Sequence, residues 1–143
     1  MSEEGAAPAA DRGAGPVLVV GAAIVRGGRV LAAQRDAPPR LAGFWELPGG
    51  KVEPGEGDRA ALVRECREEL DVDVRVGDRL AADVPIGATA TLRVFTASIA
   101  RGAPVALEHR DLRWLAAEEI DSVRWLPTNA PLLPALRALL AGG

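Results

Sequence analysis

The chain has few of the residues that build disulfide frameworks and zinc sites. Its 143 residues include one cysteine, Cys66, and one histidine, His109. A lone cysteine cannot form an intrachain disulfide, and these two residues cannot supply the several sulfur or imidazole ligands of a structural zinc ion. The sequence therefore excludes both kinds of site, and we expect the protein to work in a reducing, cytoplasmic setting.

Long apolar runs are also missing. The longest spans residues 17–25, nine residues that include Gly21, whereas a helix needs about eighteen to cross a bilayer. Residues 1–15 are acidic and lack an apolar core, so we expect a flexible tail there and no secretory signal. A chain of this length has room for one domain. We place that domain at residues 16–143 and expect no membrane partner.

Aromatic residues and net positive charge are scarce as well. Phe, Trp and Tyr make up 3% of the chain, and the formal net charge is −3. Few rings are available for bases to stack on, and an acidic surface does not attract a phosphodiester backbone. We therefore exclude polymeric nucleic acid as a partner. The hydrophobic share of 48% and the charged share of 26% are typical of a globular protein with a real core.

The first half of the chain reads as strands and turns. Residues 17–25 predict a buried strand, Gly27-Gly28 a two-residue turn, and residues 29–35 its antiparallel partner. Two prolines interrupt regular structure at residues 36–40, and a tight turn is expected at residues 48–50.

The second half alternates between helices and strands. Residues 58–70 predict a helix that begins near Gly57 or Asp58 and contains no interior proline or glycine. Further elements follow: strands at residues 72–76, 91–99 and 113–115, a helical turn at 116–120 and a closing helix at 131–140. This order predicts an α/β or α+β fold in which a mixed sheet lies between helices.

Acidic residues are concentrated around the predicted central helix. Seven of the twenty acids fall in the nineteen residues 53–71, where even spreading predicts roughly three. Helical geometry places Glu65, Glu68 and Glu69 on one side and an apolar stripe on the other. One interpretation is a solvated face softened by an ion pair from Arg64 to Glu68. The other is a site for a hard cation, Mg²⁺ or Mn²⁺, that also meets a substrate phosphate. The glycines before the helix favour the cation site.

The segment that starts at Gly50, GKVEPGEGDRAALVRECREELDV, resembles the Nudix box, G-x5-E-x7-R-E-U-x-E-E-x-G-U, in which U is a bulky apolar residue. The residues that match in register are Gly50, Glu56, Arg64, Glu65, Glu68, Glu69 and Val72. Two positions depart from the pattern. Cys66 replaces an aliphatic residue, a small change. Asp71 stands where the pattern has glycine, so we expect a slightly strained left-handed turn that costs about 1 kcal/mol.

The resemblance covers roughly residues 17–140 and is greatest to the MutT-type nucleoside triphosphate pyrophosphohydrolases. Arg35, the segment at residues 45–51 and the segment at residues 127–131 carry it. It implies the Nudix fold, in which a mixed sheet is sandwiched between helices and the box forms a loop-helix-loop. It also implies Mg²⁺-dependent hydrolysis, with Mn²⁺ as a substitute, of nucleoside triphosphates to a nucleoside monophosphate and pyrophosphate. Sanitation of the nucleotide pool, acting on 8-oxo-dGTP or (d)CTP, would follow. We expect a monomer or a homodimer.

The resemblance also implies roles for individual residues. Glu65, Glu68 and Glu69 would bind Mg²⁺, with Glu65 deprotonating or orienting the attacking water and Arg64 orienting Glu65. The further residues implied are Glu108 and Gly49 at the metal, Gly50 and Glu56 as structural parts of the box, Arg35 and Lys51 at phosphate, and Asn129 and Trp45 at the base.

Five of these positions have structural alternatives. Glu108, Arg35 and Lys51 could be surface charges, Asn129 could cap the last helix, and Trp45 could belong to the core.

Two other functions compete with this one. A Nudix hydrolase could act on another nucleoside diphosphate-linked substrate, although the chain carries no added domain. A non-catalytic Nudix module could sense a nucleotide, but such modules commonly lose box carboxylates, and this chain keeps all of them. The chain contains no P-loop, which argues against an ATPase.

Overall fold

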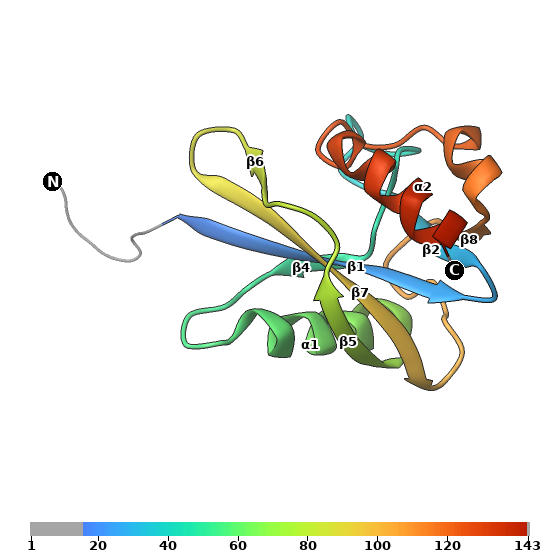
Figure 1. The fold of residues 1–143 in the computed structure, drawn as a ribbon. Coiled ribbons are helices and arrows are strands. Elements are labelled where there is room, and N and C mark those ends of the chain that lie inside the picture. The colour runs from blue at the N-terminus through green and yellow to red at the C-terminus, as the bar shows by residue number, and fades with distance from the viewer. Residues whose placement is uncertain (1–15, 143) are drawn as a thin grey trace, which may run out of the picture.

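A computed structural model describes residues 16–142, so the tail expected at residues 1–15 lies outside the described residues. Eight strands form one mixed sheet, with β3-β2-β1-β7-β5 as its main path, β4 beside β1, β6 beside β7 and β8 beside β2 (Figure 1). The strands are β1 (Val17–Arg26), β2 (Arg29–Gln34), β3 (Trp45–Glu46), β4 (Gly49–Lys51), β5 (Asp73–Arg79), β6 (Val84–Ile86), β7 (Ala90–Arg101) and β8 (Asp111–Leu115). The helices are α1 (Asp58–Leu70), the 3-10 turns η2 (Ala117–Ser122) and η3 (Ala130–Leu132), and α2 (Leu133–Gly142).

β1 is the centre of the sheet. It runs parallel to β7 and antiparallel to β2 and β4. The predicted hairpin is confirmed: Arg26 pairs with Arg29, and the turn residues Gly27 and Gly28 have φ values of 58° and 76°. A two-residue turn with two positive φ angles follows the twist of the strands it joins, and glycine adopts such angles at no steric cost.

The tight turn predicted at residues 48–50 is wrong. Gly49–Lys51 instead forms the short strand β4, which pairs with β1. A Cβ atom on Gly49 would lie 1.9 Å from the carbonyl oxygen of Val20. The glycine is therefore needed for a close approach of two backbones in the sheet. In the sequence alone, a glycine pair with this role cannot be told from one in a turn.

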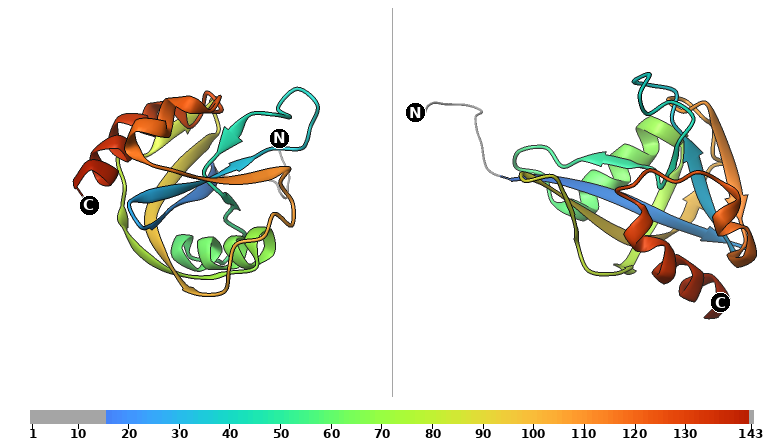
Figure 2. Two further views of the ribbon diagram at one scale, coloured as in Figure 1. Left: turned by 90° about the vertical axis from the view of Figure 1, so that its right-hand side faces the viewer. Right: turned by 90° about the horizontal axis from the view of Figure 1, so that it is seen from above.

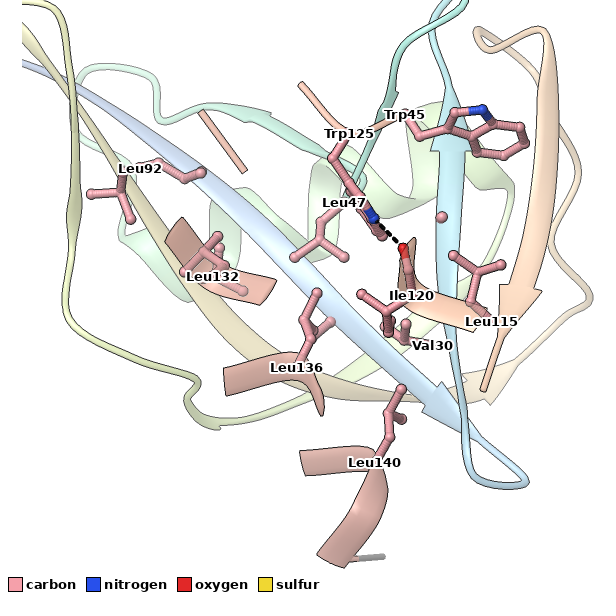
Figure 3. Close-up of a cluster of buried hydrophobic side chains, with 14 residues drawn as sticks. Val30, Trp45, Leu47, Leu92, Leu115, Ile120, Trp125, Leu132, Leu136 and Leu140 are labelled. Atoms are coloured by element: carbon pink, nitrogen blue, oxygen red, sulfur yellow. Dashed lines mark hydrogen bonds between the residues drawn. The ribbon is translucent and has the colours of Figure 1, made fainter. Parts of the chain in front are cut away.

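Helices cover both faces of the sheet, as predicted. α1 lies against one face and α2 with η2 and η3 against the other (Figures 1 and 2). Leu62, Cys66 and Leu70 of α1 belong to one buried cluster. Leu132 of η3 and Leu136 and Leu140 of α2 belong to the other, where they face the sheet (Figure 3). The expected mixed sheet between helices is thus confirmed.

Further details differ from the sequence prediction. The closing helix begins with the 3-10 turn η3 before α2 proper, and the short strands β3 and β6 were not predicted. In residues 16–142, none of the helices combines the length and apolarity needed to cross a membrane.

The end of α1 matters for the site. Asp71 has φ 58° and ψ 40°, and its N–H donates to the carbonyl of Arg67, so the predicted left-handed turn is present. The loop after β7 then docks on the last carbonyls of the helix. The N–H of Val105 donates to the carbonyl of Leu70 at 2.9 Å, and that of Leu107 to the carbonyl of Glu69 at 3.1 Å. This docking satisfies carbonyls that have no partner within the helix and brings the next residue, Glu108, toward it.

Candidate active site

Arg64 organises the acidic side of α1. Its Nε and Nη2 donate to the two carboxylate oxygens of Glu56 at 2.8 and 3.0 Å. Its Nη1 donates to Glu65 Oε2 at 3.1 Å and to Glu68 Oε1 at 3.2 Å, and its Nη2 also reaches the carbonyl of Lys51. One guanidinium therefore offsets the repulsion among three carboxylates and ties the helix to the end of β4.

Glu56 fixes the loop that leads into α1. The hydrogen bond from Arg64, helped by one from the N–H of Glu53 at 3.0 Å, lowers the pKa of Glu56 to about 2. The side chain is thus a permanent anion at neutral pH. Its partners are all within the protein, which fits a structural part of the site.

Glu65 lies against Gly50. A Cβ atom on Gly50 would lie 2.4 Å from the Cδ atom of the Glu65 carboxylate, so only glycine leaves room for the acid there. Burial raises the pKa of Glu65, and the hydrogen bond from Arg64 opposes that rise. A carboxylate whose pKa is raised is a better proton acceptor than an ordinary one.

Glu69 is turned inward and is only 9% exposed. The sequence placed it on an anionic side with Glu65 and Glu68, but its Oε1 accepts a hydrogen bond from the N–H of Gly49 at 3.1 Å, at the edge of the sheet. Burial raises its pKa to about 8, against the opposing effects of His109 and of the Gly49 N–H. Glu69 therefore links the helix to β4.

Two neighbouring pockets open beside these residues. The first has a volume of about 180 Å³ and is lined by Arg35, Asp36, Ala37, Glu46, Glu69, Glu108 and His109. The second has a volume of about 130 Å³ and is lined by Val19, Val20, Arg35, Glu46, Leu47, Gly49, Gly50, Ile86, Leu92, Thr128 and Asn129. Arg35 and Glu46 line both pockets. The two pockets are therefore adjacent at Arg35 and Glu46.

The predicted metal ligands are only partly brought together. Glu65 and Glu68 meet at Arg64, while Glu69 and Glu108 line the first pocket. Over the described range 16–142, no three His, Cys, Asp or Glu side chains are close enough around one point to hold an ion. The donor set itself, four carboxylates with the backbone of Gly49 beside them, is all oxygen and suits a hard divalent cation such as Mg²⁺.

The predicted phosphate contacts lie at different depths. Arg35 lines both pockets, and its Nη1 donates to both carboxylate oxygens of Glu46 at 3.2 Å. Lys51 is exposed at the end of β4. Arg35 is therefore the one of the two with a fixed place in the pockets.

Of the two residues predicted to contact the base, Asn129 lines a pocket and Trp45 does not. Asn129 is buried and lines the second pocket; its Oδ1 accepts from the N–H of Leu47 at 3.0 Å. It is the N-cap residue of η3, and among the described residues its side chain makes no capping hydrogen bond. Trp45 is 4% exposed, belongs to the buried cluster drawn in Figure 3 and lines neither of these two pockets, as in its alternative place in the core. Its indole supplies apolar area to the core.

Sequence reasoning missed two residues of the pockets, Glu46 and His109. Glu46 is an acid between the buried residues Trp45 and Leu47, a pattern that could have marked it as paired. His109 had no such signal. Its ring is buried, and Nε2 lies 2.9 Å from Glu46 Oε2. Burial lowers the pKa of His109, but the bond to Glu46 and the nearby charges outweigh it and raise the pKa.

The sheet sandwiched between helices and the group of glutamates around Arg64 are what the resemblance to the Nudix box implies. Residues 15–139 match the NUDIX domain. The chain belongs to the Nudix hydrolase family, which confirms the resemblance seen in the box. Enzymes of this family generally use divalent metal ions.

Relatives extend the likeness over most of the chain. One relative is a Mycobacterium tuberculosis (strain H37Rv) protein that is named as a candidate 8-oxo-dGTP diphosphatase 2. The two sequences are 48% identical over 128 residues, which cover 87% of this chain and 91% of that protein. The chain is 42% identical over 127 residues to the CTP pyrophosphohydrolase of Escherichia coli K12, covering 87% and 94%. Among solved structures, the E. coli ORF135 protein superposes with a TM-score of 0.75 at 40% identity, covering 88% of this chain and 91% of that one.

Proposed function

We propose that the protein hydrolyses nucleoside triphosphates to a nucleoside monophosphate and pyrophosphate with Mg²⁺, and so removes unwanted nucleotides such as 8-oxo-dGTP or (d)CTP from the pool. One observation carries the proposal. The glutamates of the box are all present: Glu56, Glu65 and Glu68 converge on Arg64, and Glu69 lines the first pocket. The names of the similar proteins from M. tuberculosis and E. coli support this choice of substrates.

The chemistry needs positive charge near the phosphates. A triphosphate resists attack because its own negative charge repels a nucleophile. Glu65, Glu68 and Glu69 would hold Mg²⁺, with Glu108 and the backbone of Gly49 as further ligands and Mn²⁺ as a possible substitute. When bound, the cation supplies the charge that neutralises the phosphates.

The residues of the chain carry the proton and orient the reactants. Arg64 holds Glu65 at Oε2, so that Oε1 is the oxygen that takes the proton of the attacking water. The water oxygen bonds to the β-phosphorus, the bond from that phosphorus to the bridging oxygen breaks, and the nucleoside monophosphate leaves with that oxygen. Arg35 and Lys51 would bind phosphate oxygens. Asn129 would hydrogen-bond the base from the second pocket, because one amide can both donate and accept.

A substrate panel tests the proposal. Pyrophosphate release is measured in parallel from 8-oxo-dGTP, dCTP, CTP and dGTP with Mg²⁺, and again with EDTA. We expect EDTA-sensitive release from at least one of the first three that exceeds release from dGTP. Absence of release from all four, with Mg²⁺ and with Mn²⁺, would overturn it. A nucleotide sugar and a dinucleoside polyphosphate are added to the panel to detect a Nudix hydrolase of another specificity, and calorimetry with the same nucleotides detects binding without turnover.

A further inference from the structure

Three polar side chains from distant parts of the chain form a connected row beside the pockets. The ring of His109, in the loop before β8, meets Glu46 of β3 at 2.9 Å between Nε2 and Oε2. Glu46 in turn receives Nη1 of Arg35, just after β2, at 3.2 Å on each of its two oxygens. Because an ionised carboxylate only accepts hydrogen bonds, Nε2 of His109 is the donor to Glu46.

All three side chains line the first pocket, and their exposure rises along the row. The side chain of His109 is 5% exposed, that of Glu46 15% and that of Arg35 32%. The second ring nitrogen of His109, Nδ1, is buried without a hydrogen-bond partner in the described part of the chain. A half-satisfied buried imidazole is costly, and such a group calls for an explanation other than packing.

The geometry points to His109 as a positioning residue for substrate binding: it fixes the carboxylate of Glu46, and Glu46 holds the guanidinium of Arg35 where the two pockets meet. The inference rests on the proposed function in one respect, that Arg35 binds the nucleotide.

The physical reason lies in the symmetry of the Arg35–Glu46 contact. Nη1 is equally distant from both carboxylate oxygens, so this contact alone does not fix the rotation of the carboxylate. The bond from His109 to Oε2 does fix it. An arginine that is already held in place loses less conformational freedom when it binds a phosphate or a base. His109 lines the first pocket, but its side chain is only 5% exposed and its Nε2 is bonded to Glu46, so its effect on the substrate passes through Glu46.

Kinetics of two variants test this role. His109→Leu removes the donor, whereas His109→Gln places an N–H near the position of Nε2. For the best substrate of the panel, we expect His109→Leu to raise KM about fivefold to tenfold with kcat changed less than about twofold, and His109→Gln to restore KM to within about twofold of wild type. A fall in kcat with unchanged KM would overturn the proposal, because it would place the effect at the neighbouring Glu108. Equal losses in both variants would overturn it as well.

A second measurement does not depend on turnover or on the fold of a His109 variant. His109 is the one histidine of the chain, so once any histidine tag is removed its imidazole ¹⁵N signals can be observed alone. In the nucleotide-free protein, we expect Glu46→Gln and Arg35→Ala each to shift the Nε2 signal. Arg75→Ala, at an exposed arginine on β5, is the matched control and should leave the signal in place.

The two measurements separate the two proposals. If the Nε2 signal of His109 does not shift in Arg35→Ala, Arg35 is not coupled to His109 through Glu46, and the positioning role is overturned. Signals that respond as expected in a protein that releases no pyrophosphate from any nucleotide would instead count against the proposed function and leave the connection from His109 to Arg35 standing.

Discussion

At Gly50 the backbone leaves room for the carboxylate of Glu65, since a Cβ atom there would lie 2.4 Å from its Cδ. We predict that Gly50→Ala lowers the turnover rate at least tenfold, because the added methyl displaces the acid that takes the proton of the water. The free energy of unfolding should fall by only about 1 kcal/mol, because the end of a side chain can move aside more easily than packed backbone. Steady-state kinetics and denaturant unfolding measure the two effects.

Gly57→Ala is the control for that change. Within residues 16–142, nothing beyond its chain neighbours lies within 4 Å of the Cβ position at Gly57, and this residue precedes the same helix. The control should keep its activity at a stability cost below about 1 kcal/mol. Full activity in Gly50→Ala would show that the contact between Gly50 and Glu65 has no part in the reaction.

Glu65 itself allows a sharper prediction. Glu65→Gln keeps the size of the side chain and an oxygen for Arg64, but it removes the proton acceptor. We expect the rate to fall at least a hundredfold, about 2.7 kcal/mol of transition-state stabilisation, with an unchanged circular dichroism spectrum and melting temperature. Glu118→Gln, at an exposed glutamate in η2, should retain full activity. Equal activity in Glu65→Gln would refute the assignment of the site.

Some residues of the site were predictable from the sequence and others were not, for a physical reason. The box residues lie within one helix and its leading loop, so fixed spacing determines which of them are neighbours. Glu46 and His109 are 63 residues apart, and their contact depends on how the loop before β8 folds back onto β3. The burial of Glu69 was unpredictable for the same reason, because its partner is the backbone of β4.

At the scale of elements, sequence reasoning succeeded where local chemistry decides the structure. The bounds of α1 follow from the glycine before it and from an interior without helix breakers. The strand β4 was missed because its pairing with β1 depends on the absence of a side chain at Gly49. The local sequence around Gly49 does not show that the backbone of β1 lies next to it.

The end of α1 gives a test at this scale. Asp71 has the left-handed conformation, φ 58° and ψ 40°, which glycine adopts without the steric cost that other residues bear. We predict that Asp71→Gly raises the free energy of unfolding by up to about 1 kcal/mol and that Asp71→Ala lowers it. Chemical denaturation of both variants against wild type measures the difference.

Asp78→Gly is the matched control for Asp71→Gly. Asp78 lies within β5, outside the residues with positive φ, so glycine there should destabilise the strand by about 0.5 to 1 kcal/mol. If Asp71→Gly were destabilising to the same extent, the turn at Asp71 would carry no strain that glycine can relieve.

At the scale of the whole molecule, arginines join the elements through carboxylates. Arg93 of β7 donates to Asp58 at the start of α1 at 3.0 Å and to Asp83 at 2.9 Å, and Arg64 joins α1 to Glu56 and to the end of β4. Hydrogen bonds from Arg93 lower the pKa of Asp83, as those from Arg64 lower the pKa of Glu56. Folding therefore favours the ionised forms of these acids, and acid should weaken the packing of α1 on the sheet.

Glu56 gives this expectation a defined pH range. Its pKa is lowered from 4.5 to about 2 on folding, so its contribution to stability is fully present above pH 4.5 and is lost as the pH falls toward 2. We predict that Glu56→Gln is less stable than wild type at pH 7, and that the difference shrinks as denaturant unfolding is repeated at lower pH and nearly vanishes near pH 2. In an Arg64→Met background, the same Glu56→Gln change should lose most of its pH dependence, because Arg64 is the main cause of the lowered pKa. A difference that stayed constant from pH 7 to pH 2 would mean that Glu56 contributes to folding through its shape and not through its charge.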